Sequence, residues 1–225
     1  PPTSFGLPSK AGGKWKVRAF RNAFPILDAG ARYKPPKDWF EWSSPGFGEH
    51  EVIVETDEHG KLFQNFDSRQ LSMVFKSYKN RFVELSKRKG IECIFLFKNH
   101  GKAGGASIEH EHAQITALPF VPPLIAREIA FSQLYEHEHG KCFYCVLRKN
   151  EGEKSVLFEN ASFVALRPSF ARFPFEFWIM SKRHVENMAQ LSEKEAVLFM
   201  SALSQAISKV FNVSQDYNVL FHDSP

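Results

Sequence analysis

The sequence predicts an α+β fold in which helices pack on one side of an antiparallel sheet. Two segments, residues 66–90 and 191–211, repeat apolar residues at helical spacing. The segments on either side of each helix are apolar runs typical of strands. The order strand, strand, helix, strand also occurs twice, which indicates an internal repeat. Antiparallel strands with helices on one face belong to the α+β class.

Both helices carry start signals. Asp67 is the expected N-cap of the first, with Gln70 three positions on, and Gly90 closes it. Ser192 and Glu195 form the capping-box pattern of the second. The apolar stripes are interpreted as core packing; they comprise Leu71, Val74, Phe75, Tyr78, Phe82 and Leu85 in the first helix, and Ala196, Phe199, Met200, Leu203, Ile207 and Val210 in the second.

The strands that flank the helices correspond in pairs. "HEVIVETDEHG" precedes the first helix as a strand ending in His59, and "FEFWIMSKRHV" precedes the second as a strand ending in His184. "CIFLFKNHG" and "YNVLFHDSP" follow them, and "FRNAFPIL" upstream resembles "FENASFVAL". We therefore expect a first half at residues 1–117, a connection with a CxxC at 118–154, and a second half at 155–225. The second half is expected to be incomplete at its C-terminus, and both native ends to be lacking.

Composition narrows the class of protein. No stretch is apolar enough to cross a membrane and no basic, apolar leader is present, which predicts a cytoplasmic protein. The net charge is +4 with acids and bases mixed, which does not indicate a nucleic-acid partner, although a nucleotide-sized anion could bind locally. Three cysteines argue against a disulfide framework and for a reducing compartment.

The cysteines predict a metal site. Cys142 and Cys145 have the spacing that directs two thiolates at one zinc ion, and His184 in the same half is the natural third ligand. The alternative is a pair of free or redox-active thiols, although no thioredoxin-like βαβ pattern surrounds them. In the first half His59 and His110 are the equivalents, and two upstream thiolates could complete a site with them. Either histidine could equally be an ordinary polar cap.

The stretch "IEHEHAQITA" raises the question of catalysis. On a strand, His110, His112 and Gln114 point to one face. An imidazole is a good nucleophile toward phosphorus, and its phosphoramidate can pass the group on. The preceding run "NHGKAGGAS", which includes Gly105, can bring backbone amides close to a phosphate. Gln114 can donate to a phosphoryl oxygen but does not readily supply a proton, which suits transfer between phosphates better than hydrolysis.

The sequence resembles the galactose-1-phosphate uridylyltransferase branch of the histidine-triad superfamily. The resemblance covers nearly the whole chain and rests on "WKVRAFRNAFP", "HEVIVETDEHG", "FKNHGKAGGASIEHEHAQI", "FENASFVALRPSFARFPFEFWIMSKRHV" and "YNVLFHDSP". It implies two histidine-triad-like halves, each an antiparallel half-barrel with packed helices. It also implies that His112 is the nucleophile and that Gln114 holds the phosphoryl oxygens. Asn99 and Ser107 would contact the substrate phosphates, and Asn22 would lie at the nucleoside.

The resemblance implies zinc, with ligands that vary. The first site would use His59 and His110 with an N-terminal CxxC, which this sequence lacks. The second site would use either Glu128 and His222, or Cys142, Cys145 and His184 with a later histidine. Both sets are present, and the cysteines favour the thiolate version. The C-terminal segment that usually reads the hexose is also expected to be lacking from these residues.

The expected reaction is ping-pong transfer of a uridylyl group from UDP-glucose to a hexose 1-phosphate, expected to be galactose 1-phosphate, through a uridylyl-histidine on His112. One alternative is an adenylyl-transferring phosphorylase of the ADP-glucose type. Another is a zinc-stabilised nucleotide-binding module without catalysis, although a pure binder needs no nucleophile. The resemblance implies a homodimer, and no nucleic-acid or membrane partner is expected.

Overall fold

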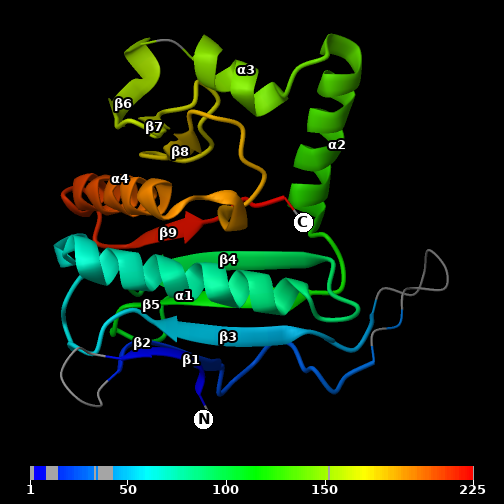
Figure 1. Cartoon of the computed structure of the whole chain (residues 1–225), viewed down its shortest axis with the longest axis vertical. Coiled ribbons are helices and arrows are strands. Elements are labelled where there is room, and N and C mark those ends of the chain that lie inside the picture. The colour runs from blue at the N-terminus through cyan, green and yellow to red at the C-terminus, as the bar shows by residue number, and fades with distance from the viewer. Residues whose placement is uncertain (1–2, 9–14, 33, 35–42, 152, 225) are drawn as a thin grey trace.

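Six strands form one open antiparallel sheet in the order β1-β2-β3-β5-β4-β9 (Figure 1). The computed structural model describes residues 3–8, 15–32, 34, 43–151 and 153–224. The antiparallel α+β architecture is confirmed. The strands of this sheet are β1 (Thr3–Pro8), β2 (Trp15–Arg21), β3 (Glu49–Val54), β4 (Cys93–His100), β5 (His112–Leu118) and β9 (Tyr217–Leu220).

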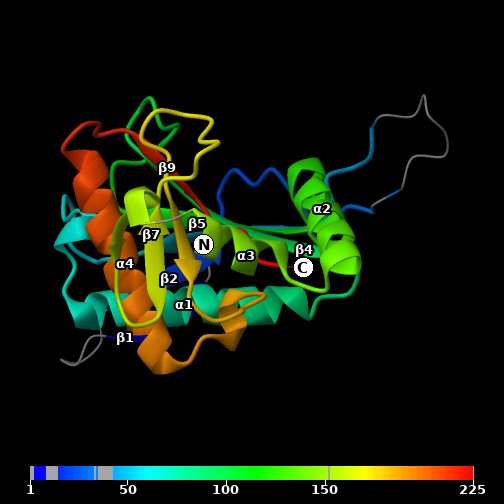
Figure 2. The same cartoon turned by 90° about the horizontal axis from the view of Figure 1, so that it is seen from above.

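A second, three-stranded sheet lies beyond the helices. It has the order β6-β7-β8. Helix α1 lies along one face of the large sheet, and α4 lies beside α1, between it and the small sheet (Figures 1 and 2). The remaining bounds are β6 (Val156–Glu159), β7 (Phe163–Leu166), β8 (Trp178–Ser181), α1 (Ser68–Ser86), α2 (Pro123–His139), α3 (Phe143–Asn150) and α4 (Glu193–Phe211), with short 3₁₀ helices at Phe63–Asn65, Glu153–Ser155 and Met188–Gln190.

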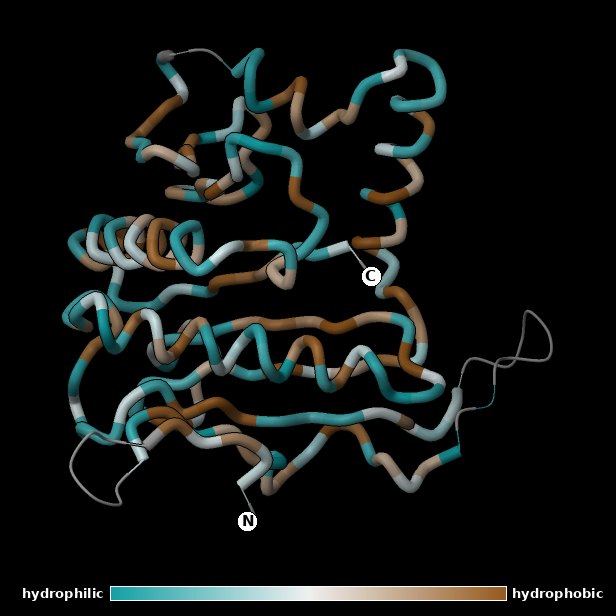
Figure 3. Tube along the Cα trace, in the orientation of Figure 1, coloured by the Kyte–Doolittle hydropathy of each residue, from teal (hydrophilic) through white to brown (hydrophobic). Residues whose placement is uncertain are grey.

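The helices predicted from periodicity, α1 and α4, are confirmed. Asp67 caps α1 by accepting the backbone N–H of Gln70. Ser192 and Glu195 form the complete capping box of α4. Brown and teal alternate along both helices in Figure 3, and their apolar sides are buried in one core with the sheet. Their stripes therefore serve packing, as expected.

The large sheet has two distinct faces. Ala113, Ile115 and Ala117 of β5 point to the buried core that α1 covers. By strand alternation, His112 and Gln114 point to the opposite face. Gln114 pairs with Val52 of β3 on one side and Phe97 of β4 on the other. The candidate nucleophile thus lies on a central strand, on the face away from α1.

Three boundaries differ from the expectation. Strand β3 ends at Val54 and β8 at Ser181, so His59 and His184 lie in the loops that follow rather than at strand ends. Strand β5 begins at His112, so His110 precedes it. The pattern of apolar residues could not locate these ends, because a loop can also present alternating polar and apolar side chains.

The segment expected to connect the halves contains helices α2 and α3. Pro123 starts α2, where its missing N–H costs no hydrogen bond, and Gly140 ends it in the left-handed conformation at φ +64°. Along α2 only Ile125 is buried. Without a buried stripe, no helical periodicity marked this segment. No helix in the described ranges is long and apolar enough to span a membrane.

Candidate functional site: a nucleophile strand and a thiolate cluster

His112 has one ring nitrogen engaged and the other available. Its Nδ1 lies 2.8 Å from the carbonyl oxygen of His110, and a carbonyl only accepts. Nδ1 therefore carries the hydrogen, and in the neutral ring Nε2 carries a lone pair. Burial lowers the pKa of His112, so the neutral, nucleophilic form is favoured near neutral pH. The side chain is 4% exposed.

Gln114 and Asn22 both contact a third residue, His50. Gln114 Oε1 is 2.8 Å from His50 Nε2. The Asn22 amide nitrogen is 3.2 Å from the same atom, and its Oδ1 accepts the N–H of Phe24 at 2.9 Å. The structure thus brings together the residues expected at the phosphoryl group and at the nucleoside. His50 was not singled out from the sequence.

The glycine-rich loop after β4 is fastened by residues from the end of the chain. Asn218 of β9 donates to Asn99 Oδ1 at 2.8 Å and to the Gly104 carbonyl at 2.7 Å. A Cβ on Gly104 would lie 2.2 Å from the His100 carbonyl oxygen, and Gly105 has a φ of +83°. Both positions therefore require glycine. Ser107 is exposed on the same loop.

A buried charge cluster lies beneath the nucleophile, on the face under α1. Lys98 Nζ donates to Glu55 at 2.6 Å, to Glu111, and to the His112 carbonyl at 3.1 Å. Tyr78 of α1 donates to Glu55. Burial opposes the charge of Lys98, but the two carboxylates outweigh it and raise its pKa. This lysine therefore stays charged and fixes the main chain at His112.

His59 and His110 lie side by side, with their Nδ1 atoms 3.3 Å apart. His110 Nε2 is 2.7 Å from the Thr56 carbonyl and must donate to it. That leaves the His110 Nδ1 lone pair directed at the other imidazole. A ligating histidine usually donates its second nitrogen to a carbonyl in this way. The pair could supply two nitrogen ligands, and its metal role stays a prediction.

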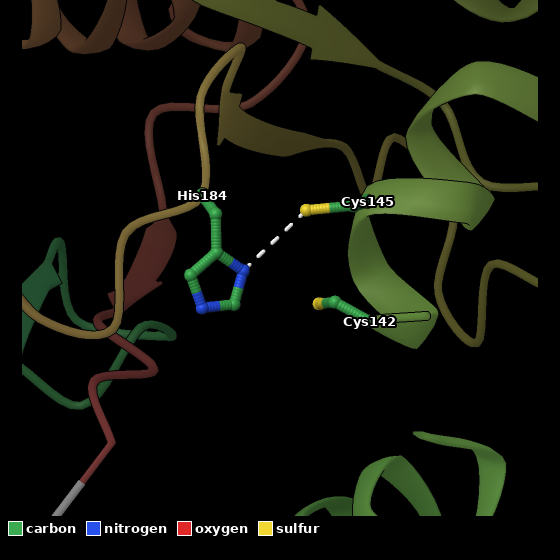
Figure 4. A group of neighbouring side chains, drawn as sticks. All are labelled: Cys142, Cys145 and His184. Carbon is green, nitrogen blue, oxygen red and sulfur yellow. Dashed lines mark hydrogen bonds between the residues drawn. The ribbon is translucent and has the colours of Figure 1, made fainter. Parts of the chain in front are cut away.

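Cys142 and Cys145 at the start of α3 converge with His184 from the loop after β8 (Figure 4). Their ligand atoms lie within 4.8 Å of one another, and Cys145 Sγ is 3.5 Å from His184 Nδ1. In tetrahedral zinc, bonds of ~2.3 Å to sulfur and ~2.0 Å to nitrogen place a sulfur and a nitrogen ligand about 3.5 Å apart. Burial and the neighbouring Cys142 raise the pKa of the Cys145 thiol, so a cation is needed to favour the thiolate. The donor set fits zinc.

The alternative ligands also meet. His222 Nδ1 lies 2.8 Å from Glu128 Oε2 on α2. Within the described ranges, however, three or more metal-ligating side chains gather only at the cysteine cluster. The thiolate set is thus the more complete of the two.

Comparison with known proteins places the chain in a family. The profile of "Galactose-1-phosphate uridyl transferase, N-terminal domain" matches residues 14–122. The galactose-1-phosphate uridylyltransferase of Thermotoga maritima is 31% identical over 219 residues, which are 94% of this chain and 68% of that protein. The chain belongs to the galactose-1-phosphate uridylyltransferase family.

A relative with a different name is equally similar. ADP-glucose phosphorylase of Arabidopsis thaliana is 31% identical over 215 residues, which are 94% of this chain. The crystal structure of an ADP-glucose phosphorylase from Arabidopsis thaliana with bound ADP-glucose superposes with a TM-score of 0.88 at 29% identity, covering all of this chain and 70% of that one. This chain spans 60% of the plant relative's length.

Two site residues escaped the sequence reasoning. His50 lies in "GEHEVIVET", where the alternation of the strand placed it on the same face as Val52. Only the register of β3 against β5 shows that this face of β3 lies beside Gln114. Asn218 lies in "YNVLF", and only the pairing of β9 with β4 brings it to Asn99.

Proposed function

We propose that the protein is a nucleotidyltransferase that works by double displacement. His112 Nε2 attacks the α-phosphorus of a nucleotide sugar; the P–N bond forms, the bond to the bridging oxygen breaks, and a sugar 1-phosphate leaves. A phosphate oxygen of an acceptor then attacks the same phosphorus, and the P–N bond breaks. The observation that carries this proposal is the Nδ1–H of His112 held by the His110 carbonyl, which directs the free lone pair to Nε2.

The substrates proposed are UDP-glucose and a hexose 1-phosphate, with galactose 1-phosphate as the acceptor. The similarity to the uridylyltransferase of Thermotoga maritima supports this choice. Asn99, Ser107 and Gly105 would face the phosphates, Asn22 the nucleoside, and Gln114 the transferred phosphoryl group. No proton donor is needed for the leaving group, because a phosphate is a weak base.

An adenylyl-transferring phosphorylase is the second candidate. The equal identity to the plant ADP-glucose phosphorylase and the superposition on the ADP-glucose complex favour it. In that case inorganic phosphate would be the acceptor, and the histidine chemistry would be unchanged.

Zinc is the proposed metal. Cys142, Cys145 and His184 would hold it in the second half, and it would stabilise the fold there. His59 and His110 would be ligands of a second ion. A homodimer is the proposed assembly, which light scattering of the protein in solution tests.

Labelling separates the candidates. The protein is incubated with UDP-glucose or ADP-glucose labelled at the α-phosphorus and quenched in base, where a phosphohistidine survives. UDP-glucose is expected to leave label on the wild type, and His112→Ala should abolish it. His137→Ala removes an exposed histidine on α2 and should label normally. Label from ADP-glucose alone would establish the phosphorylase, and label from neither would leave a binding module.

A further inference from the structure

We infer that His50 is a positioning residue that fixes the side-chain amide of Gln114 with its nitrogen free for the phosphoryl group. This inference rests on the proposed function. His50 lies on β3, which pairs directly with the nucleophile strand β5, and is 4% exposed. Its ring contacts Gln114 of strand β5 and Asn22, which follows strand β2.

The hydrogen bonds of His50 determine its tautomer. The backbone N–H of Ile26 lies 3.2 Å from His50 Nδ1. A backbone N–H can only donate, so Nδ1 must accept and carries no hydrogen. In the neutral ring the hydrogen is therefore on Nε2. Burial lowers the pKa of His50, which favours this neutral form.

This tautomer in turn determines the orientation of Gln114. Nε2–H of His50 donates across 2.8 Å to the oxygen of the Gln114 amide. If the amide turned over, its NH₂ would face Nε2–H, and two donors would oppose each other without an acceptor. The NH₂ of Gln114 is thus kept for another acceptor. Phosphoryl oxygens are such acceptors, and they gain charge density during transfer.

Asn22 contacts the same ring. Its Oδ1 accepts from Phe24, so its NH₂ faces His50, with the nitrogen 3.4 Å from the accepting Nδ1 and 3.2 Å from Nε2. Its backbone N–H donates to the His50 carbonyl at 2.8 Å. The nucleoside-side asparagine and the phosphoryl-side glutamine are therefore connected through one imidazole. A bound nucleoside that orders Asn22 would order Gln114 by the same contacts.

Two variants separate the two hydrogen bonds of the ring. In His50→Asn, the side-chain oxygen can still accept from Ile26, but nothing reaches Gln114. In His50→Gln, the longer amide can place a donor where Nε2 was. We expect His50→Asn to slow formation of the nucleotidyl-enzyme by roughly 100-fold, with the KM for the nucleotide sugar and the Tm near wild type. His50→Gln should recover the wild-type rate to within about threefold.

A double variant shows whether His50 acts through Gln114. In a Gln114→Met background, adding His50→Asn should change the rate by less than about threefold, because the contact is already lost. A full additional loss in that background overturns the inference. So does a rate in His50→Asn equal to wild type, or a His50→Gln variant as slow as His50→Asn.

A spectroscopic readout distinguishes failure of this inference from failure of the proposed function. The ¹⁵N shifts of the imidazoles, with His50 assigned by its loss in His50→Asn, should show a protonated Nε2 and an unprotonated Nδ1. A protonated Nδ1 overturns the inference even if the wild type transfers normally. If neither nucleotide sugar labels the wild type, the proposed function fails. The orientation of Gln114 by His50 then stands if the shifts show Nε2–H, and it fails if they show Nδ1–H.

Discussion

The central strand β5 of the large sheet and the edge strand β8 of the small sheet differ in how firmly they are held. Strand β5 lies between β3 and β4 and hydrogen-bonds to both, and five of its seven residues are buried. Strand β8 of the small sheet pairs with β7 alone in the described part of the chain, and its side chains are half-buried. A strand paired on both sides has its backbone groups satisfied and its side-chain directions fixed. Strand β5 is therefore suited to hold reacting groups in place.

Charged residues show the same contrast. In the first half Arg81 and Glu51 form a two-point ion pair that is almost inaccessible, beside the Lys98 cluster. In the second half the Arg183–Glu195 pair is partly exposed. Loss of a partner should accordingly cost far more in the buried pairs of the first half than in the partly exposed Arg183–Glu195 pair.

Lys98→Met should have the largest effect on stability. It leaves Glu55 and Glu111 buried without their cation, which we expect to lower the free energy of unfolding by about 3–5 kcal/mol. Urea titration followed by circular dichroism measures it. Lys87→Met is the control, because its pair with Glu84 is exposed and should contribute little. Equal losses in the two variants would remove the contrast between buried and exposed charges.

Cys142→Ser should have a large effect confined to the second half. Changes around a metal ligand weaken binding roughly 10–100-fold, so loss of a ligand should weaken zinc binding by more than about 100-fold. Zinc content and competition with a chelator measure this. Labelling at His112 should persist, because β5 is held by β3 and β4. Glu128→Gln is the matched control; if that variant loses zinc and Cys142→Ser keeps it, the ion lies at Glu128 and His222.

Glu195→Gln should have the smallest effect, present near neutral pH and lost in acid. Hydrogen bonds from Arg183 and from Ser192 lower the pKa of Glu195 to about 2. A carboxylate with a lowered pKa stabilises the fold above its unfolded value of about 4.5, and this contribution is lost as the pH falls through about 2. Partial exposure limits it to under about 1 kcal/mol. The variant should flatten the acid side of the Tm–pH profile, and Glu193→Gln, which is fully exposed, should not.

Local signals explain what the sequence could predict. Asp67 and Ser192 mark helix starts because capping depends on residues three positions away. His112 and Gln114 share a face because a strand alternates. Contacts between strands could not be predicted from local signals, because His50 contacts Gln114 only through the register of β3 with β5. Helix α2 was missed because few of its side chains are buried.

The pairing of β9 with β4 has a consequence for biosynthesis. Asn99 and Asn218 are 119 positions apart. Asp216 accepts the backbone N–H of Ala103 in the same loop, and these two residues are 113 positions apart. While a ribosome makes the intervening residues, β4 therefore presents an unpaired edge. Contacts of such long range also form slowly. The nascent first half should thus be a substrate for chaperones until β9 emerges, and mature phosphate-loop geometry should arise late in folding.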